Sequence, residues 1–182
     1  ELLKNYKRNI NDDKKISKKE LVSDIEDNES TNVLVTGGCG FIGSNFINRI
    51  WNDYKKINVI NLDAMYYCAK EDNIFREIRC SPRYTLVKGN LCSYDLVKHV
   101  VDNYKITHVV NFAAQSHVQN SFEDSLNYTK DNILGTHNLL EANRHNKLLK
   151  KFIHVSTDEV YGESMNSINE QKKTEHSILC PT

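Results

Sequence analysis

Short apolar runs alternate with segments of helical spacing along the chain from residue 32 onward. The first run, residues 33–35, has three consecutive apolar residues, two of them β-branched, which is typical of a strand buried on both faces. Further runs predict strands at residues 57–62, 84–88, 107–112 and 152–155. Strands that alternate with helices predict an α/β fold with a doubly wound parallel sheet, which binds ligands beyond the carboxyl ends of its strands.

The spacing of apolar residues between these runs predicts helices. Ile42, Phe46 and Ile50 recur at four-residue steps after the first strand, so a helix is expected there. Ser93 is expected to cap a second helix with a clear apolar stripe. The residues of that stripe, which we assign to the core, are Leu96, Val97, Val100, Val101 and Tyr104.

A long helical region is predicted from residue 122 to residue 146, with Ile133, Leu139 and Leu140 on its inner side. Gly135 lies within it, and a mid-helix glycine costs about 1 kcal/mol relative to alanine. We therefore expect Gly135 to be needed for close packing, against the sheet or on the side of a bound cofactor.

Three glycines, Gly37, Gly40 and Gly43, stand three residues apart between the first strand and the first helix. Glycine permits a tight turn and the close approach of an anion, while the helix N-terminus offers free N–H groups and a positive dipole end. A glycine triplet alone is also compatible with an ordinary tight turn. The strand before it and the helix after it favour a dinucleotide site, and hence a Rossmann-type doubly wound parallel sheet.

An acidic residue, Asp63, ends the second strand, twenty residues after Gly43. A carboxylate there is well placed to accept hydrogen bonds from the adenosine ribose, and it would repel a 2′-phosphate, so NAD is favoured over NADP. The alternative is an acid that makes a turn at the strand end. Ala113 and Ala114 follow the fourth strand, where small residues leave room for a ligand.

The composition narrows the possible partners. The 182 residues carry 24 basic and 24 acidic side chains, so no charge excess indicates a nucleic-acid or membrane partner. The five cysteines are scattered and form no Cys-x-x-Cys pair, so neither a disulfide framework nor a metal site is indicated. We expect a reduced, cytoplasmic setting.

The first 31 residues differ from the rest of the chain. They are rich in charge, lack glycine and proline, and contain few apolar residues. This composition favours a solvated, disordered or weakly helical extension, and the alternative is an interaction arm or the tail of a preceding domain. We therefore predict two parts, a charged extension at 1–31 and a dinucleotide-binding domain at 32–182 that is incomplete at its C-terminus.

Four segments carry a resemblance to a known family. They are residues 36–43 with the spacing Gly-x-x-Gly-x-x-Gly, residues 112–118, residues 132–136, and residues 155–162, which read Val-Ser-Thr-Asp-Glu-Val-Tyr-Gly. Together they resemble the extended short-chain dehydrogenase/reductase family, and more narrowly the nucleotide-sugar 4,6-dehydratases that act on dTDP-glucose or UDP-glucose. Residues 62–68 are more similar to the UDP-glucose enzymes of rhamnose biosynthesis.

The resemblance implies a lyase reaction and catalytic roles for Thr157, Asp158 and Glu159. Bound NAD takes a hydride from C4 of the hexose and returns it to C6. Glu159 would remove the C5 proton, Asp158 would protonate the departing C6 hydroxyl, and Thr157 would bind the C4 oxygen. Ser116 and His117 are further substrate candidates, although a structural histidine is as plausible as a ligand contact at position 117. A solvated turn is the alternative for the Asp-Glu pair.

The cofactor contacts follow from the motifs and the resemblance together. They are Gly37, Gly40, Phe41, Ile42, Gly43, Asp63, Asn90, Leu91, Ala113, Ala114, Ser116 and Asn132. Asn90 is a departure, because the family usually has an aspartate there that meets the adenine. An amide can still accept and donate hydrogen bonds, so adenine binding is expected to be weakened or re-oriented.

The family's catalytic base is the tyrosine of a Tyr-x-x-x-Lys pair on a later helix, and Tyr161 does not match it, because Met165 stands where the lysine would be. We therefore expect the chain to be the NAD-binding part of a longer enzyme, a homodimer in the parent protein, and to be inactive alone. The alternatives are a sugar-nucleotide epimerase or decarboxylase of the same fold, against which the Asp158-Glu159 pair argues, and a non-catalytic NAD-binding protein.

Overall fold

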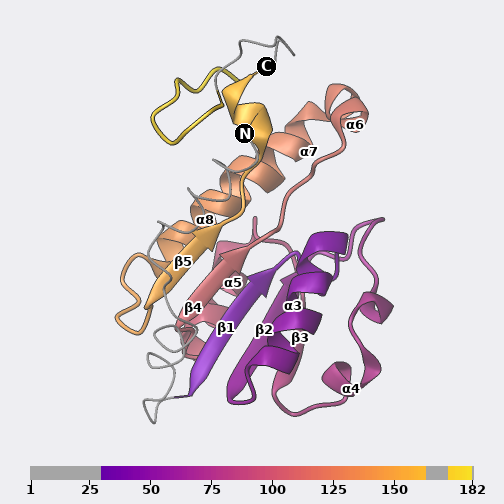
Figure 1. Cartoon of the computed structure of the whole chain (residues 1–182), viewed down its shortest axis with the longest axis vertical. Coiled ribbons are helices and arrows are strands. Elements are labelled where there is room, and N and C mark those ends of the chain that lie inside the picture. Colours follow the sequence, from indigo (N-terminus) through magenta and orange to yellow (C-terminus); the bar gives the residue numbers. More distant parts are fainter. Residues whose placement is uncertain (1–29, 163–171, 182) are drawn as a thin grey trace, which may run out of the picture.

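The computed structural model describes residues 30–162 and 172–181 (Figure 1). Nearly all of the predicted charged extension lies outside the described residues, and so do residues 163–171 and 182. The first strand already includes Thr31, so the predicted boundary at residue 32 falls one residue inside that strand. Among the residues described, no helix is long and apolar enough to cross a lipid bilayer.

Within the described residues, five parallel strands form one sheet in the order β3-β2-β1-β4-β5, which confirms the predicted α/β fold with its doubly wound parallel sheet (Figure 1). The strands are β1 (Thr31–Thr36), β2 (Ile57–Asp63), β3 (Tyr84–Lys88), β4 (His108–Asn111) and β5 (Lys151–His154). The strand order reverses between β1 and β4. This point is where an open α/β sheet binds its ligands.

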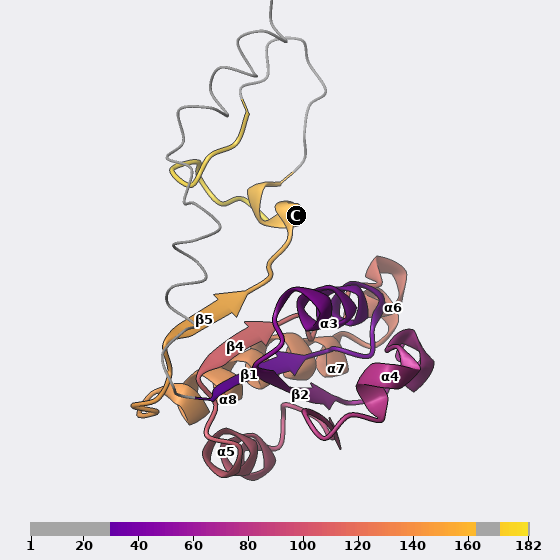
Figure 2. The ribbon, with the colours of Figure 1, turned by 60° about the horizontal axis from the view of Figure 1, so that its bottom comes forward.

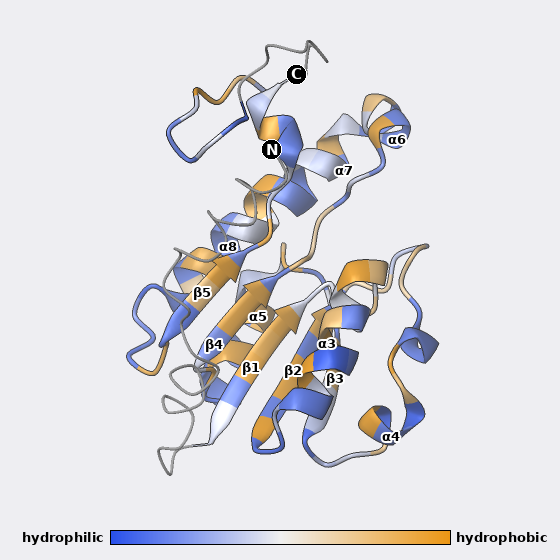
Figure 3. Ribbon diagram, in the orientation of Figure 1, coloured by the Kyte–Doolittle hydropathy of each residue, from blue (hydrophilic) through white to orange (hydrophobic). Residues whose placement is uncertain are grey.

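Helices cover both faces of the sheet (Figure 2). On one face lies α3 (Phe41–Asp53), and the connection after β2 adds the short helices η1 (Glu71–Asn73) and α4 (Arg76–Arg79). On the other face lie α5 (Tyr94–Asn103) and α8 (Gly135–Asn143). The apolar strands β1, β2 and β4 run between these layers (Figure 3), so the core is divided into two clusters, one on each side of the sheet.

The α5 stripe is confirmed as core, because Val97, Val100 and Val101 are buried against the sheet and α8. Ser93 occupies the N-cap position, as predicted, but its side chain makes no capping hydrogen bond. The edge strand β5 is less well covered, and Ile153 within it is exposed.

The predicted helix at 122–146 is divided. It consists of α6 (Val118–Glu123), α7 (Ser125–Thr129), a π-helical turn η2 (Lys130–Leu134) and α8. Gly135 packs closely, as predicted: a Cβ there would lie 3.1 Å from the Cβ of Leu91.

The predicted inner side of this helical region was only partly right. Leu139 is fully buried, but Ile133 and Leu140 are exposed. The buried face of α8 is set by Gly135, Asn138, Leu139 and Ala142, the residues that meet α5 and the segment after β3. Ile133 and Leu140 lie off this face.

Candidate active site

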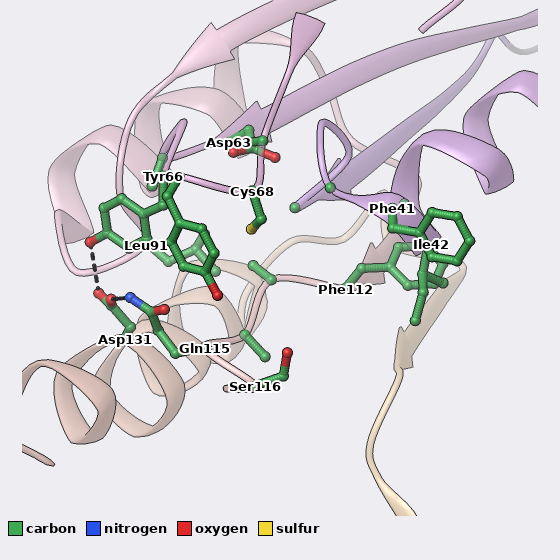
Figure 4. A pocket seen from close by; sticks show the side chains of 18 of the residues that line it. Phe41, Ile42, Asp63, Tyr66, Cys68, Leu91, Phe112, Gln115, Ser116 and Asp131 are labelled. Carbon is green, nitrogen blue, oxygen red and sulfur yellow. Dashed lines mark hydrogen bonds between the residues drawn. The ribbon is translucent and has the colours of Figure 1, made fainter. Parts of the chain in front are cut away.

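A hollow of about 380 Å³ lies at the carboxyl ends of β1, β2 and β4, beside the point where the strand order reverses (Figure 4). All but one of the predicted cofactor residues line it, namely Gly37, Gly40, Phe41, Ile42, Gly43, Asp63, Asn90, Leu91, Ala113, Ala114 and Ser116. Sequence reasoning missed further lining residues, among them Tyr66, Tyr67, Cys68, Phe112, Gln115 and Asp131. The volume is within the range of small-molecule sites.

The glycine turn is closely packed against neighbouring backbone, both its own and that of the segment after β4. Gly37 has a φ of +69°, and a Cβ there would lie 2.8 Å from the backbone of Ala113. A Cβ on Gly43 would lie 2.4 Å from the carbonyl oxygen of Gly37. Because no side chain fits at either position, the turn brings bare backbone to the edge of the hollow. The helix α3 begins at that edge with Phe41, and the first N–H groups of a helix have no partner within it.

Two polar side chains of β2 hold this turn in place. Asn61 is fully buried, and its Oδ1 accepts the N–H of Gly38 at 3.1 Å while its Nδ2 donates to the hydroxyl of Tyr84 at 2.9 Å. Asp63 accepts the N–H of Cys39 at 2.8 Å through Oδ2. Sequence reasoning did not single out Asn61, although an amide inside an otherwise apolar strand was a signal that could have found it.

The other end of the hollow carries a polar cluster around Asp131 (Figure 4). Its Oδ1 accepts from Asn90 Nδ2 at 3.0 Å and from the hydroxyl of Tyr66 at 3.3 Å, and its Oδ2 accepts from Gln115 Nε2 at 3.1 Å. Burial acts to raise the pKa of Asp131, but hydrogen bonds from Asn90, Gln115 and two further donors outweigh it and lower that pKa. The carboxylate is therefore ionised at neutral pH.

Asn132 is the predicted cofactor residue that does not line the hollow. Its Oδ1 accepts the N–H of Gln115 at 2.7 Å, and its Nδ2 donates to the carbonyl oxygen of Gln115 at 2.9 Å. The side chain thus fixes the backbone after β4, and Asn132 borders the hollow only through Gln115.

The predicted substrate residues Ser116 and His117 separate in the structure. Ser116 lines the hollow, whereas His117 does not. The Nδ1 of His117 accepts the N–H of Asn120 at 3.3 Å and so caps α6, and its carbonyl oxygen accepts the hydroxyl of Tyr128 at 3.0 Å. In this geometry His117 has a structural role in the segment that follows β4.

Thr157, Asp158 and Glu159 follow β5 at the same edge of the sheet but do not line the hollow (Figure 1). The short helix η3 (Asp158–Tyr161) begins there, and Thr157 caps it by accepting the N–H of Glu159 at 3.2 Å. All three side chains are exposed. The structure therefore brings these three residues together in one turn and leaves them open to a ligand on that side.

Comparison with known proteins identifies the family. The model of the family described as GDP-mannose 4,6-dehydratase matches residues 34–181. The chain belongs to this family. Membership of the GDP-mannose 4,6-dehydratase family agrees with the predicted resemblance to nucleotide-sugar 4,6-dehydratases.

Several relatives show how this member of the GDP-mannose 4,6-dehydratase family compares. It is 45% identical over 133 residues to a trifunctional UDP-glucose 4,6-dehydratase/UDP-4-keto-6-deoxy-D-glucose 3,5-epimerase/UDP-4-keto-L-rhamnose-reductase of Arabidopsis thaliana, matching 73% of this chain and 20% of that protein. It is 42% identical over 161 residues to the dTDP-D-glucose 4,6-dehydratase of Dictyostelium discoideum, matching 82% of this chain and 36% of that protein.

A solved structure of dTDP-glucose 4,6-dehydratase from Bacillus anthracis, in complex with NAD, has the same fold with a TM-score of 0.72 and 36% identity. The match covers 84% of this chain and 44% of that one. The chain therefore spans less than half the length of each of these relatives.

Cys39 lies inside the glycine turn of this GDP-mannose 4,6-dehydratase family member. Burial, with the nearby carboxylate of Asp63, raises the pKa of the Cys39 thiol to about 11, so it stays protonated at neutral pH. A protonated thiol is a poor nucleophile. All five cysteines of the chain are free, and Cys39 is the buried one among them.

Proposed function

We propose that these residues form the NAD-binding part of a nucleotide-sugar 4,6-dehydratase, which converts UDP-glucose or dTDP-glucose to the 4-keto-6-deoxy sugar. The observation that carries the proposal is the hollow at the reversal of strand order, which joins a bare glycine turn on β1 to an acid at the end of β2. The NAD complex of the Bacillus anthracis relative and the names of the other relatives support it.

The residues present fit NAD. Gly37, Gly40 and Gly43 line the hollow without side chains, which leaves the backbone of the turn open to a pyrophosphate at the N-terminus of α3. The carboxylate oxygens of Asp63 each accept one backbone N–H, from Cys39 and Met65, at 2.8 Å. Each oxygen retains a second acceptor site, which the ribose hydroxyls would occupy, and a 2′-phosphate would be repelled.

The chemistry of the proposal is divided between the cofactor and the turn after β5. Bound NAD supplies a hydride acceptor and donor. Thr157 would hold the C4 oxygen of the sugar, Glu159 would take the C5 proton, and Asp158 would give a proton to the C6 hydroxyl as it leaves. The two carboxyl groups need opposite protonation states for these tasks, and the sugar itself would help to set them by covering the exposed turn.

The cofactor part of the proposal is tested by calorimetric titration of the chain with NAD⁺ and NADP⁺. We expect NAD⁺ to bind at least about tenfold more tightly, because the 2′-phosphate meets the carboxylate of Asp63. The substitution Asp63→Asn should narrow that preference, with circular dichroism as the control for folding. If the two dinucleotides bind equally well, Asp63 does not have the proposed role. If neither dinucleotide binds, the proposed NAD site is overturned.

The reaction is tested in a longer protein that contains this sequence and also the part of the relatives that this chain does not match. Product analysis by NMR should show a 4-keto-6-deoxy sugar, and Glu159→Gln should reduce its formation by at least about a hundredfold. A C4 epimer would indicate an epimerase instead, and NAD binding without turnover would indicate a non-catalytic protein. On the family resemblance, we extend the proposal to a cytoplasmic homodimer without a nucleic-acid partner.

A further inference from the structure

A row of three polar side chains crosses the sheet at the carboxyl ends of the neighbouring strands β1, β4 and β5 (Figure 1). Thr36, Asn111 and His154 are register partners on these strands. Register partners of a parallel sheet share a face, and this row lies on the face of α5 and α8, because Val109, two residues before Asn111, belongs to the core cluster there. The chemistry above gives Asn111 no task.

The hydrogen bonds of the row determine where the protons lie. The hydroxyl of Thr36 donates to Oδ1 of Asn111, and Nδ2 of Asn111 lies 2.9 Å from Nδ1 of His154. An amide nitrogen only donates hydrogen bonds, so Nδ1 of His154 is the acceptor, and the proton of the neutral ring is on Nε2. Thr36 and Asn111 are fully buried, so each depends on these partners.

Asn111 holds the end of β5 in two ways. The strand has four residues, lies at the edge of the sheet and, within the described residues, pairs with β4 alone. Beside the side-chain bond to His154, the carbonyl oxygen of Asn111 accepts the N–H of Val155 at 3.0 Å. Figure 2 shows that the chain leaves the sheet after β5, and Thr157 follows two residues after Val155. The start of the Thr157 turn is therefore fixed from Asn111.

The other partner of Asn111 leads to the proposed cofactor site. Thr36 is the last residue of β1 and directly precedes Gly37 of the glycine turn. Asn111 thus connects the strand that leads into the proposed NAD turn with the strand that leads into the proposed catalytic turn. The distance between these turns matters, because a misplacement of about 1 Å between reacting groups can slow a reaction about a hundredfold.

We propose that Asn111 is a positioning residue for the dehydratase reaction, which sets the place of the Thr157 turn relative to the glycine turn by holding His154 with its ring proton on Nε2. Asn111 does not line the hollow, so it acts through Thr36 and His154. The inference rests on the proposed function, since it gives a task to the residue between the two proposed sites.

Nitrogen-15 NMR of the imidazole rings tests the tautomer in this chain at about pH 8, where free histidine has lost its second proton. The signals of His154 are those that disappear in His154→Gln. We expect a proton on Nε2 and none on Nδ1. Asn111→Asp should place a proton on Nδ1, because a carboxylate has acceptors only. His108, at the start of β4, is the internal control, and its signals should not change.

Two results of the NMR measurement would overturn the inference. One is a proton on Nδ1 of His154 in the wild-type chain. The other is a folded Asn111→Asp chain in which Nδ1 of His154 still has no proton. The wild-type spectrum decides the tautomer even if Asn111→Asp does not fold.

The positioning role is tested in the longer protein by Asn111→Leu, which removes both side-chain bonds. We expect turnover per bound NAD to fall at least about tenfold. The Kd for NAD⁺ should change less than about threefold, because Asn61 and Asp63 still hold the glycine turn. The matched control is Asn58→Leu at the far end of β2, which should keep both values. A merely structural role would lower NAD-binding capacity and product formation in proportion, and so leave turnover per bound NAD unchanged.

The outcomes separate this inference from the proposal on which it rests. If the longer wild-type protein forms the 4-keto-6-deoxy sugar and Asn111→Leu keeps its turnover per bound NAD, the inference alone is overturned. If the longer wild-type protein forms no such sugar, the proposed function is overturned and the inference with it.

Discussion

Asn61 is a buried amide that ties the glycine turn to β2. Its Oδ1 is the acceptor for the N–H of Gly38, and its Nδ2 donates to Tyr84. A leucine has a similar size but no acceptor, so Asn61→Leu would leave the buried N–H of Gly38 without a partner. We expect a loss of about 1–3 kcal/mol in the free energy of unfolding, measured with urea, and weaker binding of NAD⁺.

The control for that prediction is the same change, asparagine to leucine, at Asn58, another residue of β2. Asn58 donates to Asn32 at 2.8 Å at the opposite end of β2, away from the hollow. Asn58→Leu should cost less than about 1 kcal/mol and leave NAD⁺ binding unchanged. An Asn61→Leu chain as stable as the wild type would show that the turn does not depend on the amide.

The glycines of the turn differ in the space around them. A Cβ on Gly43 would lie 2.4 Å from the oxygen of Gly37 and 2.8 Å from the Cα of Gly38, and backbone cannot easily move away. Gly43→Ala should therefore cost about 1–3 kcal/mol in the free energy of unfolding. Gly40→Ala is the comparison, because its one close contact is at 3.3 Å, and a cost below about 1 kcal/mol is expected in the same urea measurement. Equal losses for the two variants would contradict the packing argument.

At the scale of elements, the π-helical turn η2 connects the helical region after β4 to the hollow. Two consecutive residues within it, Asp131 and Asn132, both reach Gln115 after β4. Asp131 binds the side chain of Gln115, and Asn132 binds its backbone. The turn thus supplies one lining residue of the hollow, Asp131, and fixes the backbone of another, Gln115.

Asn132→Ala removes both partners of the Gln115 backbone and should lower the free energy of unfolding by about 1–2 kcal/mol. Gln115→Ala keeps that backbone pairing and loses one side-chain bond to Asp131, so a cost below about 1 kcal/mol is expected. Urea denaturation of the two variants measures the difference. A larger loss for Gln115→Ala would show that the side-chain contact holds the segment.

The sequence predicted the strands well and the helix faces less well, for a physical reason. A strand buried on both faces is a mostly apolar run, and β1, β2 and β4 show such runs directly. The inner face of α8 depends on what packs against it. Leu91 lies against Gly135, and Asn138 donates to the carbonyl oxygens of Leu91 and Cys92 at 3.0 Å, and these contacts cannot be read from helical spacing alone.

At the scale of the whole molecule, the residues of the candidate site that follow from the strand pattern were predicted, and those that depend on contacts between distant segments were not. Gly37, Asp63 and Ala113 were predicted because each lies at a strand end, and strand ends share one edge of a parallel sheet. Asp131 and Asn61 were missed because their roles arise from contacts between distant segments. Asn90 was predicted from its place after β3, whereas its hydrogen bond to Asp131 could not be read from the sequence.

The whole chain is expected to lose stability in acid, in two steps. Burial, with Lys150 and Lys151 nearby, lowers the pKa of His108 from its ordinary 6.5. A group whose pKa is lower in the folded state gives its full stabilisation above the unfolded pKa, and this is lost as pH falls toward the folded value. The first step therefore begins below about pH 6.5, and the lowered pKa values of Asp131 and Glu71 place the second below about pH 4.

Urea denaturation at about pH 7.5 and about pH 5 separates the His108 step from the second step, because Asp131 and Glu71, whose pKa values are lowered, remain ionised across that interval. The wild-type chain should be less stable at the lower pH, and His108→Gln should reduce this difference, since glutamine does not titrate. His99→Gln, at an exposed position on α5, is the matched control and should keep the wild-type difference. If His108→Gln loses as much stability as the wild type between the two pH values, protonation of His108 is not the cause of the loss. The acid sensitivity then arises from another group.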